Sequence, residues 1–177
     1  VNRYCSSGLQ TIATAANAIR CGEEDVVIAG GVESMSLVPM LVGAEDADPW
    51  LAEHRPEVYT TMGITAENVA RQWGISRADM DAMAVESHRR AAQAQAGGCF
   101  DGQIIPITVP GPDGGEVVVC RDEGIRPGTT AETLAGLKPC FLENGSVTAA
   151  TSSQMTDGAG FVVLMSEEKA AELGVKP

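Results

Sequence analysis

"NRYCSSGLQTIATAANAIRCGEEDVVIAGG", residues 2–31, is the stretch that decides the fold class. Leu9, Ile12 and Ile19 recur at helical intervals in its first half, and Gly22 follows as a helix stop. The second half ends in "DVVIAGG", a short run rich in β-branched residues with no polar alternation. Such a run is typical of a strand buried on both faces, in a parallel sheet that helices cover. The stretch therefore predicts an α/β fold.

The composition limits the classes of partner. The chain has 177 residues, of which 44% are apolar, so a globular protein with its own core is expected. Its formal net charge of -12 argues against a nucleic-acid partner, because such binding depends on neutralising phosphates. No apolar run approaches the roughly 20 residues that span a bilayer, so no membrane partner is expected. No signal peptide is found, and the ends at Val1 and Pro177 are interpreted as cut, with any targeting signals lost with them.

The middle of the chain differs from its two ends. Residues 42–141 hold both tryptophans, two helical patterns and a hairpin turn at "GPDGGE". The first helical pattern, "TAENVARQWG", is expected to end at Gly74, and the second, "SRADMDAMAVESHRRAAQAQAGG", to begin with Ser76 as its cap and Asp79 as the capping-box acid. After residue 144 the α/β pattern returns, with the buried-type strand "FVVLM" and the capped helix "SEEKAAELG". The prediction is an incomplete α/β domain, residues 1–41 and 142–177, with a mixed domain at 42–141 inserted into it.

The cysteines and histidines argue against disulfides and metals. An odd number of cysteines without a C-x-x-C pair does not fit a disulfide framework, and two histidines, His54 and His88, are too few for an ordinary zinc site. No metal is predicted, and a reducing compartment, the cytoplasm, is expected. The five cysteines are Cys5, Cys21, Cys99, Cys120 and Cys140.

Cys5 stands at the start of the first predicted helix. The partial positive charge and free N–H groups of a helix N-terminus stabilise a thiolate and an oxyanion. The small residues Ser6, Ser7 and Gly8 leave room for an acyl group. One hypothesis is that Cys5 is an activated, acyl-carrying nucleophile; the alternative is a packing cysteine, a common buried residue. The other four cysteines are interpreted as structural, and neither histidine is obviously placed as a general base.

Five motifs in order then resemble one family, the thiolases, most closely the 3-ketoacyl-CoA thiolases (acetyl-CoA acyltransferases) of β-oxidation. They are "NRYCSSGLQTIATAANAIRCG", "AGGVESMS", "MGITAENVARQWGISRADMDAMAVESHRRAAQAQ", "DEGIRPGTTAETLAGLKPCF" and "NGSVTAATSSQMTDGAGFVVLMS". The resemblance covers nearly all of the chain. It implies a partial thiolase fold, in which an incomplete N-terminal α/β half carries the inserted loop domain, and a full-length dimer or tetramer.

The resemblance also implies residue roles. Cys5 falls on the acyl-enzyme nucleophile, which cleaves 3-ketoacyl-CoA with coenzyme A to acetyl-CoA and a shortened acyl-CoA. Coenzyme A is then a substrate, and no permanently bound cofactor is expected. The positions that fall on coenzyme-A contacts are Met62, Arg126, Thr133, Phe141 and Ser153.

The chain departs from the family pattern in several places. Ala150 stands where glycine is usual, which would be strained if that position needed a positive φ. Thr61 replaces the histidine of biosynthetic thiolases, which favours the degradative branch. The motifs "NEAF", "GHP" and "C-x-G" of the family's C-terminal half are absent, so the chain is interpreted as a central fragment, inactive alone. Two alternatives stay open: a biosynthetic acetoacetyl-CoA thiolase and a non-enzymatic lipid- or CoA-binding relative.

Overall fold

The computed structural model describes residues 1–38 and 46–177, which divide into two compact units. Unit 1 comprises Val1–Asp46 and Met155–Pro177, and unit 2 comprises Ala47–Gln154. Unit 1 contains η1 (Tyr4–Ser6), α1 (Ser7–Arg20), β1 (Val26–Glu33), β4 (Gly158–Met165) and α6 (Glu167–Leu173).

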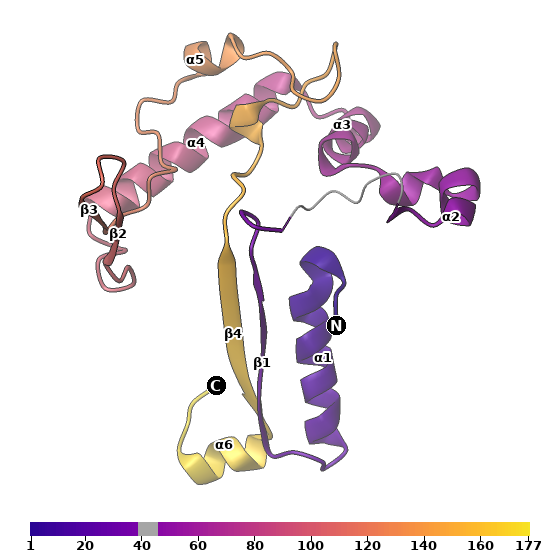
Figure 1. The fold of residues 1–177 in the computed structure, drawn as a ribbon, viewed down its shortest axis with the longest axis vertical. Helices are drawn as coiled ribbons and strands as arrows, with labels where there is room; N and C mark the ends of the chain where they lie inside the picture. The colour runs from indigo at the N-terminus through magenta and orange to yellow at the C-terminus, as the bar shows by residue number, and fades with distance from the viewer. Residues whose placement is uncertain (39–45) are drawn as a thin grey trace. The chain divides into compact units, whose positions relative to one another are not determined.

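The first helix forms as predicted. α1 runs alongside β1 in unit 1 (Figure 1), and its Ala15 is buried. The helix ends where Gly22 adopts a left-handed φ of 74°, which glycine tolerates without a Cβ clash. There the Gly22 N–H donates to the Ile19 carbonyl and the Glu23 N–H to the Ala18 carbonyl, each at 3.0 Å, which satisfies the last carbonyls of the helix.

The predicted strand forms, but the predicted parallel pairing is wrong. β1 pairs antiparallel with β4 over its whole length, from Val26 opposite Met165 to Glu33 opposite Gly158. A run of β-branched residues indicates burial, and it carries no information about the direction of the neighbouring strand. Halfway along, Gly30 lies opposite Phe161, whose ring occupies the space that a Cβ at Gly30 would need.

One face of this two-stranded sheet is exposed, although the sequence predicted burial on both faces. Ala29 is buried, whereas four large side chains of the alternate face are 60–76% exposed. Alternate residues of a strand point to opposite faces, and α1 packs along this strand pair. These four side chains are Ile28, Val32, Phe161 and Val163.

Polar contacts fix the two ends of the β1–β4 pair. Beyond β1, Ser36 donates to the Asp157 carboxylate through its N–H at 2.8 Å and its hydroxyl at 2.6 Å. Both hydrogen bonds lower the pKa of Asp157, and the one from the Ser36 hydroxyl has the larger effect. At the other end, α6 begins with a cap in which the Ser166 hydroxyl accepts from the Lys169 N–H, and it ends at left-handed Gly174, as predicted.

Unit 2 is built on helices. α2 (Pro49–His54) and η3 (Pro56–Tyr59) come first, followed by α3 (Met62–Trp73) and the long α4 (Arg77–Ala96). Gly74 ends α3 in the left-handed conformation, and Ser76 caps α4 in a reciprocal pair with Asp79, as the sequence predicted. The rest of unit 2 comprises the hairpin of β2 (Ile107–Pro110) and β3 (Glu116–Val119), then α5 (Ala131–Ala135) and η4 (Ala149–Thr151).

The expected domains, residues 1–41 with 142–177 and residues 42–141, have two boundaries. The first, between residues 41 and 42, lies outside the described residues. At the second, residues 142–154 belong to unit 2, because Glu67 of α3 binds the backbone of Ser146 and Val147. Among the described residues, no helix has the length and apolar character needed to cross a membrane.

Candidate functional site

Cys5 lies in a tight turn that leads directly into α1. The preceding residue, Tyr4, has a φ of 50°, the one positive φ outside glycine in the described residues. Hydrogen bonds hold this conformation: the Tyr4 N–H donates to Asn2 Oδ1 at 3.0 Å, and the Ser7 hydroxyl donates to the Tyr4 carbonyl at 2.8 Å. The same hydroxyl accepts from the Arg3 N–H at 2.8 Å. The turn therefore fixes Cys5 just before the helix begins.

The electrostatic setting of Cys5 differs from that of the other cysteines. All five are free and exposed, so exposure does not separate them. Cys5 precedes the positive end of α1, whose first turn holds no acidic residue and whose N-cap Ser6 makes no side-chain cap. Cys21 lies at the negative end of the same helix, and Cys99 follows the C-terminal end of α4. Of these three, Cys5 alone lies beside the positively polarised start of a helix.

Small residues surround the start of α1. A hollow of about 430 Å³ lies between the start of the helix and the ends of β1 and β4, and Cys5 itself does not line it. Its glycines leave backbone accessible beside the helix N-terminus. The lining residues from the turn and α1 include Tyr4, Ser7 and Gly8, and those from the strands include Gly30, Gly31, Gly158 and Gly160.

A larger cavity in unit 2 brings together Arg126, Thr133 and Ser153, three of the five predicted coenzyme-A contacts. Its volume is about 820 Å³, and His88 and Arg126 are its ionisable lining residues. Among the described residues, no aspartate or glutamate lines it, in a chain whose net charge is -12. Arg126 is exposed and forms no ion pair with any residue that the structure describes. The cavity therefore suits an anionic ligand.

The hydroxyl of Thr133 already has a structural task. It accepts from the Thr130 N–H at 3.0 Å and donates to the Thr130 carbonyl at 2.9 Å, while the Thr130 hydroxyl accepts from the Thr133 N–H. This reciprocal pair caps α5. A ligand in the cavity thus meets a Thr133 hydroxyl that is held in place by the helix cap.

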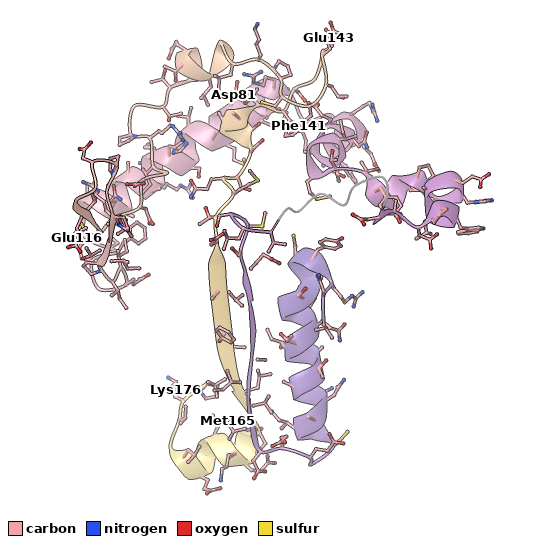
Figure 2. All side chains as sticks on the ribbon, viewed as in Figure 1. Asp81, Glu116, Phe141, Glu143, Met165 and Lys176 are labelled. Atoms are coloured by element: carbon pink, nitrogen blue, oxygen red, sulfur yellow. The ribbon has the colours of Figure 1, made fainter. Side chains whose placement is uncertain are left out.

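Met62 and Phe141 also belong to unit 2 but do not line this cavity. Met62 is the exposed first residue of α3. The ring of Phe141, labelled beside α3 in Figure 2, packs directly on the backbone of Gly63 and is 42% exposed. A Cβ at Gly63 would collide with that ring, so glycine is needed there for the close approach.

Glu67 is an important residue that the sequence analysis missed. Its side chain is buried, with 6% of the residue exposed, and its carboxylate accepts from the N–H groups of Ser146 and Val147 and from the Ser146 hydroxyl at 2.8–3.0 Å. Burial alone would raise the pKa of Glu67, but these hydrogen bonds, with the charge of Arg71, lower it below the usual value. A charge on the inward face of α3, in line with buried Gly63 and Ala70, was the available signal.

Three further expectations concern Ala150 and the histidines. Ala150 does not have a positive φ, so the strain considered for a non-glycine residue there is absent. His54 stacks on Trp50 with ring centroids 4.6 Å apart, and His88 accepts the Arg126 N–H. Both histidines belong to unit 2, whereas Cys5 belongs to unit 1. No group of three His, Cys, Asp or Glu side chains suited to a metal ion occurs among residues 1–38 and 46–177.

Comparison with known proteins finds one matching family and several proteins of similar sequence. Residues 1–168 match the family described as "Thiolase, N-terminal domain". The chain is 51% identical to the 3-ketoacyl-CoA thiolase of Bacillus subtilis and 42% identical to a probable acetyl-CoA acyltransferase of Staphylococcus aureus, in each case over 100% of this chain. It covers 47% and 48% of those proteins, so it spans about half of their length.

A solved structure matches as well. The dimeric peroxisomal thiolase of Saccharomyces cerevisiae superposes with a TM-score of 0.83 at 38% identity. The match covers 99% of this chain and 45% of the yeast chain. The two units described above therefore form part of an α/β thiolase fold.

Proposed function

Because this chain belongs to the thiolase family and matches its N-terminal domain, we propose that it forms the nucleophile-bearing part of an acetyl-CoA acyltransferase. The full-length protein cleaves a 3-ketoacyl-CoA with coenzyme A, giving acetyl-CoA and an acyl-CoA shortened by the acetyl unit. The observation that carries this proposal is the position of Cys5. It is held by a hydrogen-bonded turn at the positive end of α1, with no acidic residue in the first helical turn.

The first half-reaction forms an acyl-enzyme. The Cys5 thiolate attacks the 3-keto carbon of the substrate, and the carbonyl oxygen becomes an alkoxide that the N–H groups at the start of α1 stabilise. As the carbonyl re-forms, the C2–C3 bond breaks and its electron pair stays on C2. A proton delivered to C2 completes acetyl-CoA, and the shortened acyl group remains on Cys5 as a thioester.

The second half-reaction restores the free enzyme. The thiolate of a second coenzyme A attacks the Cys5 thioester, the shortened acyl-CoA leaves, and the Cys5 thiolate is regenerated. Every step is polar, so the proposal requires no redox group and no resident cofactor. The proton transfers need a base and an acid. The "GHP" and "C-x-G" motifs are absent from this sequence, so we assign these roles to residues outside this chain.

We assign the nucleotide end of coenzyme A to the cavity of unit 2. Arg126 provides a fixed positive charge for phosphate, and Ser153 provides a hydroxyl for the pantetheine arm that follows. Met62, the first residue of α3, and Phe141, whose ring packs on Gly63, provide apolar surface for the pantetheine or acyl chain. The five exposed free thiols suit a reducing compartment, and we place the protein in the cytoplasm. The full-length protein acts as a dimer or tetramer, in line with its similarity to the dimeric yeast thiolase.

Steady-state kinetics of the full-length protein tests the proposal. The rate of acetoacetyl-CoA thiolysis should show parallel double-reciprocal lines as coenzyme A is varied, which is the pattern of a ping-pong mechanism. Replacing Cys5 with alanine should abolish turnover, whereas Cys21→Ala, the matched control at the opposite helix end, should retain it. Faster thiolysis of longer 3-ketoacyl chains indicates the degradative branch. Binding of coenzyme A without any turnover would instead support the non-enzymatic alternative.

A further inference from the structure

A hydrogen bond between α4 and the loop at 124–129 links His88 to Arg126. The Arg126 backbone N–H donates to His88 Nδ1 at 3.2 Å, although the two residues are 38 positions apart. We propose that His88 is a positioning residue, which holds the backbone of Arg126 so that its guanidinium meets the phosphates of coenzyme A. This inference rests on the proposed coenzyme-A site and adds to it a residue that acts through Arg126.

Both backbone groups of Arg126 are held. Its N–H is held by His88, and its carbonyl accepts from the Thr129 N–H at 3.2 Å and the Thr129 hydroxyl at 2.8 Å. Pro127, the next residue, restricts its own φ and so stiffens the loop between these two anchors. Among the described residues, no ion pair holds the Arg126 side chain. Of the two backbone anchors, Thr129 belongs to the same loop, so His88 is the one that ties Arg126 to a long helix.

α4 acts as the scaffold for this wall of the cavity. On the helix face that contains buried Asp81 and Ala84, His88 follows at helical spacing. Two turns further along α4, the Gln95 amide donates to the Asp122 carbonyl at 3.1 Å, which holds the start of the same segment. At the other end of α4, Arg77 donates to the Leu134 carbonyl at 2.7 Å, beside the cap that holds Thr133.

The hydrogen-bond chemistry requires an acceptor at position 88. A backbone N–H can be held only by an atom with a free lone pair, so His88 Nδ1 carries no proton in this contact. Asparagine places its Oδ1 on the same branch atom, Cγ, and keeps an acceptor. Leucine has a similar branched shape but no acceptor, and it would leave the Arg126 N–H without its partner. The pair His88→Asn and His88→Leu therefore separates hydrogen bonding from packing.

The experiment compares two ligands on the full-length protein. Dissociation constants are measured by calorimetry for coenzyme A, and by competition for pantetheine, which lacks the nucleotide. His88→Leu should weaken coenzyme A about fivefold to tenfold, the effect of one net hydrogen bond, and should leave pantetheine within about twofold. His88→Asn should restore the wild-type value. His54→Leu, at the only other histidine of the chain, is the control and should change neither constant.

A double variant tests whether His88 acts through Arg126. Arg126→Ala should weaken coenzyme A at least as much as His88→Leu, and the combination should be no weaker than Arg126→Ala alone. If Arg126→Ala weakens coenzyme A but His88→Leu does not, the positioning role is wrong and the coenzyme-A site stands. Equal losses for both ligands, or no rescue by His88→Asn, would show a structural role only. If Arg126→Ala itself has no effect, the coenzyme-A assignment of the cavity fails, and the role of His88 fails with it.

Discussion

Glu67 and Val147 are joined by a buried hydrogen bond in which the Val147 N–H donates to the Glu67 carboxylate at 2.8 Å, across 80 positions of the sequence. The same carboxylate binds the N–H and hydroxyl of Ser146. Phe141, a proposed coenzyme-A contact, packs on Gly63, one helical turn before Glu67 in α3. Both ends of the segment from Phe141 to Val147 therefore contact α3. One charged side chain thus links the backbone at Ser146 and Val147 to α3.

Replacing Glu67 with glutamine should loosen this segment. The amide group presents N–H donors to backbone N–H donors, so at least one buried hydrogen bond is lost, at a cost of about 2 kcal/mol. Hydrogen exchange with mass spectrometry on the full-length protein should show the amides of Ser146 and Val147 exchanging at least about tenfold faster.

Glu86→Gln is the matched control for that variant. Glu86 pairs with Arg89 and Arg90 on the surface of α4, at 2.6 and 2.7 Å. Hydrogen bonds from Arg89, which has the larger effect, and from Arg90 lower the pKa of Glu86 to about 2. These ion pairs add little to the stability of the folded protein, because they are exposed and solvent screens them. Exchange near Ser146 should not change in this control. Equal effects of the two substitutions would contradict the assigned role of Glu67.

The pH dependence of the same region follows from the lowered pKa of Glu67. Its pKa in the folded protein lies below the usual 4.5, so its contribution to stability is complete above pH 4.5 and is lost as the pH falls through the folded-state value. Protection of the Ser146 and Val147 amides should therefore decline on acidification below that pH. In Glu67→Gln the decline should be smaller. A variant that keeps the full acid dependence would assign it to other groups.

Gly63 should not tolerate even alanine. The added Cβ would enter the ring of Phe141, which then has to leave its place on α3. Overpacking of this kind costs about 1–3 kcal/mol, so the thermal midpoint should fall and coenzyme A should bind more weakly. Gly136→Ala is the control, because a Cβ there meets no atom within 4 Å and its φ is -76°. Similar midpoints for the two variants would contradict the packing argument.

Cys5 should be the cysteine that iodoacetamide alkylates fastest near neutral pH. The thiolate is the reactive form, and the start of α1 favours it. Since all five cysteines are exposed, peptide mapping over time compares their reactivity rather than their burial. Cys21, at the opposite end of α1, should react more slowly. Faster labelling of Cys99 or Cys140 would contradict the proposed electrostatic setting.

Features that depend on neighbouring residues could be predicted from the sequence. The Ser76–Asp79 cap and the left-handed stop at Gly74 involve residues a few positions apart, and each formed where expected. The antiparallel partner of β1 could not be predicted, because the run "DVVIAGG" does not specify the direction of β4, more than a hundred residues later. The link between Glu67 and Val147 has the same character. Its donor is the backbone N–H of Val147, which leaves no trace in the sequence.

The candidate site divides in the same way. The local spacing around Cys5 was enough to place it at the start of a helix. The structure shows it in the turn just before α1, which the conformation of Tyr4 and its hydrogen bonds hold. Arg126, Thr133 and Ser153 were chosen by resemblance, and the structure shows that they line one cavity. His88 was not chosen, because its contact is with the backbone of Arg126 rather than with a side chain that a motif would display.

The most direct test of the central claim is to trap the acyl-enzyme. The full-length protein is mixed with acetoacetyl-CoA in the absence of free coenzyme A, quenched in acid, digested, and mapped by mass spectrometry. The account predicts an acetyl group on the peptide that contains Cys5, lost on addition of coenzyme A before the quench and absent in Cys5→Ala. An acetyl group on another cysteine, or continued turnover by Cys5→Ala, would contradict it.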